Sequence, residues 1–175
     1  FKLHKGAFRD SLCLRYGWTP DHLPTTCACG KSFTTTHALS CSLGGYPSLR
    51  HNEIRDITAH LLREVAHDVA VEPHLQPLSG EHFPLRSTIT DDNARLDIAV
   101  SGLYGGRFER TFLDVRVFNP FAPSNQKSSI PAVYRKHEKE KRRSYERRVV
   151  EVEHGSFIPV VLSTTGGHGK AAGNL

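Results

Sequence analysis

The chain contains no methionine and no run of about 20 consecutive apolar residues, the length that a membrane span requires. We therefore expect neither an integral membrane protein nor a membrane partner. Lys2 and Lys5 have no apolar run behind them, so the pattern of a secretory signal is also missing. Because not even the first residue is methionine, we expect the chain to be a piece of a longer protein.

Cysteine is scarce, with 4 residues in 175, which argues against a disulfide scaffold. Apolar residues make up 38% and charged residues 23%, so the chain can bury a core and lacks the composition of a disordered protein. Its length fits one compact domain, or one domain with a small appendage. Lys and Arg number 23 against 18 Asp and Glu, a net charge of +5 that weakly favours a polyanionic partner.

The spacing of apolar and chain-breaking residues predicts an α/β fold, in which a mixed sheet is flanked by helices. A short helix over 6–16 and a polar, turn-rich segment over 23–42 precede a boundary near Gly44 and Gly45. Gly105-Gly106 favours a hairpin, and Pro159 favours an edge position for the last strand. After the boundary we predict helices over 48–67 and 129–153, strands over 69–71, 95–100, 111–118 and 157–162, and a hairpin or loop over 75–92.

Three cysteines and one histidine follow the pattern C-x-C-x7-H-x3-C, formed by Cys27, Cys29, His37 and Cys41. Three thiolates and one imidazole can complete a tetrahedral zinc site of the structural kind, and this segment has few apolar residues to order it otherwise. The pattern therefore predicts a zinc knuckle in a reducing compartment. The alternative is three unpaired cysteines and a surface histidine.

Three further residues bear on this segment. Gly30 allows the chain to turn around the metal, and Thr36 is expected to cap the short turn that carries His37. Cys13 lies outside the pattern and is expected to be a small, buried apolar residue.

Two aspartates interrupt apolar strands: Asp97 in the strand over 95–100 and Asp114 in the strand over 111–118. A charge among apolar strand residues is costly unless it is paired or bound to a metal. On adjacent strands the two carboxylates could share one hard cation, magnesium or manganese. Alternatively, each aspartate faces solvent from a half-exposed sheet. Glu53, on the first core helix, is a further candidate for the cation shell.

Lys141 shares one face of the helix over 129–153 with Tyr134, Tyr145 and Val152, and this stripe is the helix's candidate packing face. An inward lysine beside two carboxylates could hold a scissile phosphate or orient the attacking water. Alternatively, it extends from the edge of the helix to solvent. Arg116 shares a sheet face with Asp114 and could bind phosphate, although it is a poor proton acceptor.

Eight basic residues fall between Arg135 and Arg148, where they outnumber the acidic ones. We expect a solvated face that can also contact phosphates. Arg50 and His51, at the start of the first core helix, are also expected to contact nucleic acid. The basic residues assigned to this face are Lys136, Lys139, Arg142, Arg143, Arg147 and Arg148.

Six segments between residues 27 and 117 match the pattern of one family. They are Cys27-Ala28-Cys29-Gly30, Thr36-His37-Ala38-Leu39-Ser40-Cys41, Arg50-His51-Asn52, Val71-Glu72-Pro73-His74-Leu75, Arg95-Leu96-Asp97-Ile98 and Leu113-Asp114-Val115-Arg116-Val117. Together they resemble the C-terminal end of site-specific retrotransposon polyproteins without long terminal repeats. In that family a CCHC zinc knuckle is followed by a restriction-like endonuclease of the PD-(D/E)XK superfamily. Leu96 stands in place of the family's proline, and Arg116 in place of the usual strand lysine.

The resemblance implies a magnesium-dependent endonuclease that nicks duplex DNA in the nucleus, leaving a 3′ hydroxyl that primes reverse transcription. It implies catalytic roles for Asp97 and Asp114, with the catalytic lysine moved to the helix as Lys141, ahead of Tyr145. It further implies that residues 1–24 end an upstream reverse-transcriptase region, that 25–46 form the knuckle, and that 47–175 form the nuclease-type domain. Element RNA is a second candidate partner.

Two other readings of the residues remain open. A copy that has lost catalysis could keep the fold, the zinc and the basic face as a nucleic-acid-binding module. A zinc-stabilised protein-interaction domain without a role on nucleic acid is the third. Only the enzyme should need a second divalent site with oxygen ligands.

Overall fold

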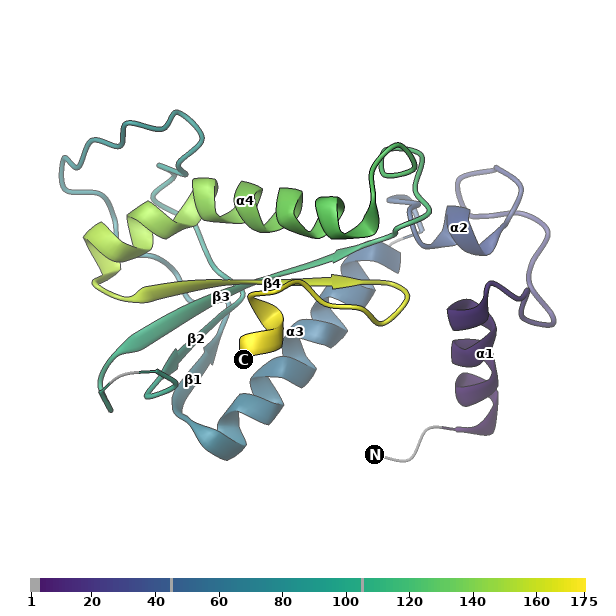
Figure 1. Ribbon diagram of the computed structural model, residues 1–175, viewed down its shortest axis with the longest axis horizontal. Helices are drawn as coiled ribbons and strands as arrows, with labels where there is room; N and C mark the ends of the chain where they lie inside the picture. The colour runs from purple at the N-terminus through teal and green to yellow at the C-terminus, as the bar shows by residue number, and fades with distance from the viewer. Residues whose placement is uncertain (1–3, 45, 105) are drawn as a thin grey trace.

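The computed structural model describes residues 4–44, 46–104 and 106–175. Its helices and strands follow the predicted order, preceded by two shorter helices (Figure 1). The helices are α1 (Lys5–Tyr16), α2 (Thr35–Ala38), α3 (Tyr46–Val65) and α4 (Ile130–Arg148), with a π-helical turn η1 (Val149–Glu153) and a 3-10 turn η2 (Ala172–Asn174); the strands are β1 (His67–Val71), β2 (Ile98–Ser101), β3 (Arg110–Phe118) and β4 (Ser156–Ser163).

The described strands form one four-stranded sheet in the order β1-β2-β3-β4. β1 and β2 are antiparallel, as are β2 and β3, whereas β3 and β4 are parallel and are joined through α4. The predicted mixed sheet with flanking helices is thus confirmed. The antiparallel pairing of β2 and β3 also confirms the expected hairpin, although Gly105 lies outside the described residues, as does Gly45 of the expected boundary.

α3 and α4 lie on opposite faces of this sheet (Figure 1). Side chains of a strand alternate between the two faces, so β2, β3 and β4 each contribute to both cores. Ile98, Val100, Leu113 and Val115 pack in the core that includes Ala59 and Leu62 of α3. The second core is on the α4 side and is built from Leu75, Ala94, Leu96, Ala99, Phe112, Val149 and Phe157.

β2 begins at Ile98, so the expectation that its strand begins at Arg95 is wrong. The residues before Ile98 leave β3 and pair instead with the segment after β1: Arg95 bridges His74, and the Leu96 N–H donates to the Pro73 carbonyl at 3.2 Å. Asp97 therefore lies immediately before β2. The second half of β3, from Asp114 onward, has β4 on one side and no β2 residue on the other.

Arg148 is fully buried, which corrects the expectation that it belongs to the solvated face of α4. It lies seven residues after Lys141, and this spacing returns a helix to the same face. Its guanidinium donates to the carbonyls of Gln76, Ile89 and Asp91 at 2.9, 3.0 and 2.7 Å. The segment over 75–92 is the predicted loop, and Arg148 attaches it to α4.

α1 ends at Gly17, which adopts a left-handed conformation with φ of 71°, as the predicted helix end requires. Cys13 is half-buried, so the expectation of a buried cysteine is wrong. The reason is that α1 stands at the side of the sheet and buries none of its described residues fully. Among the helices in the described ranges, none is both long and apolar enough to cross a bilayer.

Candidate catalytic site and metal-binding cluster

Asp97 is held by two hydrogen bonds from two different elements. Its Oδ1 lies 3.0 Å from His51 Nε2 on α3, and its Oδ2 accepts the Val115 N–H of β3 at 2.5 Å. Burial acts to raise the pKa of Asp97, but these hydrogen bonds outweigh it and the pKa is lowered. Asp97 therefore remains a carboxylate in spite of its burial.

Asp114 faces α4 and is 5% exposed. Its Oδ2 lies 2.6 Å from Lys141 Nζ. Burial raises the pKa of Asp114 to about 6; Lys141 lowers it, and the neighbouring Asp97 carboxylate raises it further. Two carboxylates thus lie close enough to influence each other, and one ammonium lies against them.

The Asp114–Lys141 contact is an ion pair without the angular geometry of a hydrogen bond. Within the described ranges, Asp114 Oδ2 accepts no hydrogen bond although it is buried. The oxygens of two neighbouring carboxylates, Asp97 and Asp114, are the hard donors that a divalent cation such as magnesium prefers. The residues present therefore fit the predicted cation.

A groove of about 350 Å³ runs beside these groups. It lies between the start of α3 and Lys141 of α4, where the second half of β3 is not covered by β2. Arg116 is exposed on this groove. The lining residues are Pro47, Ser48, His51, Asn52, Val115, Arg116, Val117 and Lys141.

The structure does not bring Glu53 to the aspartates. Glu53 is exposed on α3, and no hydrogen bond or ion pair in the described ranges joins it to Asp97 or Asp114. His51 lies beside Asp97 instead. Side chains two residues apart on a helix are rotated by about 200°, so His51 and Glu53 cannot both face the aspartates. Sequence reasoning assigned His51 to nucleic acid and missed this pairing, because nothing local links it to Asp97.

Tyr145 lies one turn after Lys141, with Lys141 Nζ 5.9 Å from the centre of its ring. Burial raises the pKa of Tyr145 to about 12, and Asp114 and Asp97 add to the effect. The phenol is therefore neutral. His137, one turn before Lys141, is buried against Phe118 with 5.1 Å between ring centres, a packing role that the sequence analysis did not foresee.

The basic residues assigned to nucleic acid divide between two places. Arg50 is half-buried and donates to the Leu39 carbonyl at 3.2 Å, so it faces the segment before α3. On α4, a hollow of about 630 Å³ lies on the side opposite Lys141 and includes Lys139. Its other basic lining residues are Arg135, Arg142, Arg143 and Arg147; Lys136 is exposed on the same helix.

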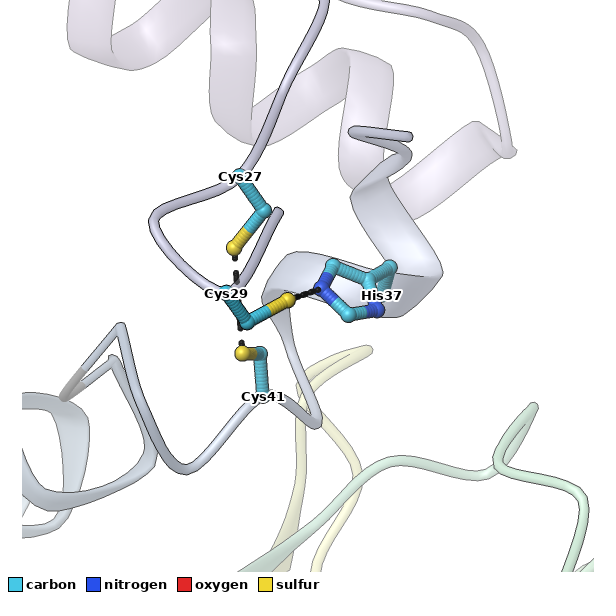
Figure 2. Close-up of side chains that lie close together, drawn as sticks. All are labelled: Cys27, Cys29, His37 and Cys41. Carbon is cyan, nitrogen blue, oxygen red and sulfur yellow. Dashed lines mark hydrogen bonds between the residues drawn. The ribbon is translucent and has the colours of Figure 1, made fainter. Parts of the chain in front are cut away.

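Cys27, Cys29, His37 and Cys41 form the predicted cluster, with their ligand atoms within 4.8 Å of one another. Figure 2 shows the four side chains pointing toward one another. Cys27 Sγ and Cys41 Sγ are 3.7 Å apart, and Cys29 Sγ lies 3.1 Å from His37 Nε2. Two sulfurs bound tetrahedrally to zinc at about 2.3 Å lie about 3.8 Å apart, so the cluster could hold zinc.

Local backbone geometry prepares this cluster. Gly30 has φ of 81°, and its N–H donates to the Cys27 carbonyl, which makes the expected turn. The N-cap of α2 is Thr34, whose hydroxyl accepts the His37 N–H at 3.0 Å; the expectation that Thr36 caps this turn is wrong, because the helix begins at Thr35. The Gly44 N–H lowers the pKa of the Cys41 thiol, which favours the thiolate that a metal needs.

The cluster contacts the α/β part of the chain at two points. Asn119, after β3, donates to Ser40 Oγ at 3.1 Å and to the Thr36 carbonyl at 3.4 Å. Arg50 of α3 donates to the Leu39 carbonyl. These contacts tie residues 36–40 to the end of β3 through Asn119 and, through Arg50, to the beginning of α3, which also borders the groove.

No protein-family model and no curated protein matches this chain. The two clusters of side chains are therefore the basis for a proposal of function.

Proposed function

We propose that this chain is a metal-dependent endonuclease domain that nicks duplex DNA by phosphodiester hydrolysis, with a zinc knuckle at residues 27–41. The main support is that Asp97, Asp114 and Lys141 come from three separate segments and meet beside an open groove. Two carboxylates and an ammonium beside a groove are groups that can carry out hydrolysis of a phosphodiester.

Asp97 and Asp114 would hold magnesium or manganese. When bound, such an ion polarises the phosphate and lowers the pKa of a water molecule. The closeness of the two carboxylates supports this assignment, since neighbouring negative charges inside a protein repel each other unless a cation or proton compensates them.

Lys141 and Arg116 would act on the phosphate. Lys141 Nζ would stabilise the negative charge that develops on the phosphate oxygens. Arg116 would hold a phosphate in the groove, since a guanidinium suits phosphate binding and is a poor proton acceptor. Tyr145, neutral and packed beside Lys141, would restrict the position of the ammonium.

Zinc would be held by Cys27, Cys29, His37 and Cys41, and its role would be structural. Four protein ligands complete a tetrahedral shell and leave no open position for a substrate. Ordering residues 36–40 would also fix the start of α3 through Arg50, and thereby one wall of the groove.

A plasmid-nicking assay with magnesium tests the proposal. We expect Asp114→Ala to abolish nicking, whereas Asp92→Ala, in an exposed loop, should leave it unchanged. Equal background cleavage by wild type and Asp114→Ala would refute the enzymatic assignment.

A nucleic-acid-binding module without cleavage is the second candidate. It is supported by the hollow on α4, where Arg135, Lys139, Arg142, Arg143 and Arg147 outnumber Glu138, Glu146 and Glu151, and which lies away from Asp114. In that case DNA would be retained at low salt, binding would weaken as salt rises, and no oxygen-ligated divalent site would be needed. Absence of any DNA retention at low salt would instead favour the protein-interaction domain.

A further inference from the structure

His51, which lines the groove, contacts Asp97 although 46 residues separate the two in the sequence. His51 lies early in α3, and its Nε2 is 3.0 Å from Asp97 Oδ1. The imidazole is 32% exposed and lines the groove, so it is accessible beside the proposed cation site. With Nε2 carrying the proton, this nitrogen donates and the carboxylate accepts.

The two hydrogen bonds to Asp97 have different origins. The Val115 N–H reaches Oδ2 at 2.5 Å and belongs to the backbone of β3, so side-chain substitution cannot remove it. His51 supplies the bond to Oδ1. A carboxylate offers about four acceptor sites, so two hydrogen bonds orient it and still leave sites for a cation.

We infer that His51 is a positioning residue that orients the Asp97 carboxylate for a divalent cation. The inference rests on the proposed function, which assigns Asp97 to that cation. Groups that hydrogen-bond a ligating carboxylate determine its orientation and thereby the affinity of the metal. Glu53 was the α3 residue expected to join the cation shell. In its place, His51 is the α3 residue next to the site, and it would orient Asp97 without binding the cation itself.

The dependence of nicking on magnesium concentration tests this role. In His51→Ala we expect the concentration for half-maximal nicking to rise by about tenfold, in the range found when such supporting groups are removed. His51→Gln should restore the wild-type value to within about threefold, because its amide reaches as far as Nε2; His51→Asn is too short and should resemble His51→Ala. His60→Ala, which removes an exposed histidine of α3 that does not line the groove, is the control and should match wild type.

A second measurement does not depend on cleavage. In ¹⁵N-labelled protein without divalent cation, the Val115 amide resonance should shift in His51→Ala and His51→Asn but stay in place in His51→Gln. If wild type does not nick DNA, the proposed function fails, while the Val115 signal still reports on Asp97. The inference is overturned if His51→Ala leaves both readouts unchanged, or if Gln and Asn behave alike. Should His51→Ala not fold, the comparison of Gln with Asn decides.

Discussion

Lys141 of α4 and Asp114 of β3 form a buried ion pair, with Nζ 2.6 Å from Oδ2. The lysine side chain is 19% exposed and reaches the groove, while the aspartate is almost completely enclosed. The pair therefore joins α4 to the sheet beside the groove. Substitutions of the two residues can distinguish an effect on the proposed catalysis from an effect on stability.

Lys141→Gln should reduce nicking by at least about 100-fold, since a positive charge aimed at the reacting phosphate is usually worth that much. Lys139→Gln is the matched control on the opposite side of α4 and should stay within about threefold of wild type. Rates in the plasmid assay at saturating magnesium give the comparison. Similar losses in both variants would show that Lys141 acts only through general charge.

Asp114→Asn should stabilise the protein at neutral pH. The folded-state pKa of about 6 lies above the ordinary value of 3.8, so the folded chain holds a proton that the unfolded chain has lost. The contribution of Asp114 to the free energy of unfolding is greatest below pH 4. It falls by at most about 3 kcal/mol as the pH rises through about 6. Urea unfolding of zinc-loaded protein without other divalent ions should show an advantage for Asp114→Asn that grows from pH 5 to pH 7. Asp92→Asn should show no such trend, and a pH-independent advantage would contradict the assignment.

Removal of one cluster ligand should release the metal. Cys41→Ser is expected to lose zinc, measured by elemental analysis, and to melt at a lower temperature, because metal binding contributes to folding. Cys13→Ser removes a cysteine outside the cluster and should keep its zinc. Equal zinc content in the two variants would disprove the assignment of the ligands.

Arg135 and Arg143 should contribute to nucleic-acid binding independently of catalysis. Both line the hollow on the outer side of α4, and neither forms an ion pair in the described ranges. In the double variant Arg135→Gln/Arg143→Gln, the slope of log affinity against log salt should fall by about 2, as expected for the loss of two phosphate contacts. Arg63→Gln/Arg107→Gln removes the same charge from exposed positions on α3 and in the β2–β3 loop. Fluorescence anisotropy with labelled duplex DNA gives both slopes, and equal slopes would exclude a specific role for the hollow.

Arg148→Met should lower the free energy of unfolding by at least about 2 kcal/mol, because three carbonyls lose their donor. Arg147→Met removes an exposed ion pair with Glu151 and should cost less than about 1 kcal/mol. Urea denaturation compares the two neighbours. If both cost the same, the guanidinium of Arg148 does not hold the 75–92 loop.

Patterns that depend on neighbours along the chain could be predicted from the sequence. Apolar periodicity predicted helix α3 and strand β3. Ligand spacing within one short segment predicted the metal-binding cluster of Cys27, Cys29, His37 and Cys41. The two aspartates were visible because each interrupts an apolar run. Arg148 could have been recognised as facing inward, since it shares a helix face with Lys141. Only the folded structure shows that carbonyls of the 75–92 loop accept its hydrogen bonds and so compensate the cost of burying the charge.

The pairing of groups from distant segments was decided by the tertiary structure. Nothing near His51 in the sequence indicates Asp97, and Glu53 was as plausible a partner from composition alone. The choice between them depends on the rotation of α3 over the sheet and on β2 starting at Ile98, which leaves Asp97 free to meet the Val115 N–H. Local sequence therefore determined the elements and the zinc ligands, whereas rotation and register, which arise from packing of the whole core, determined which side chains meet.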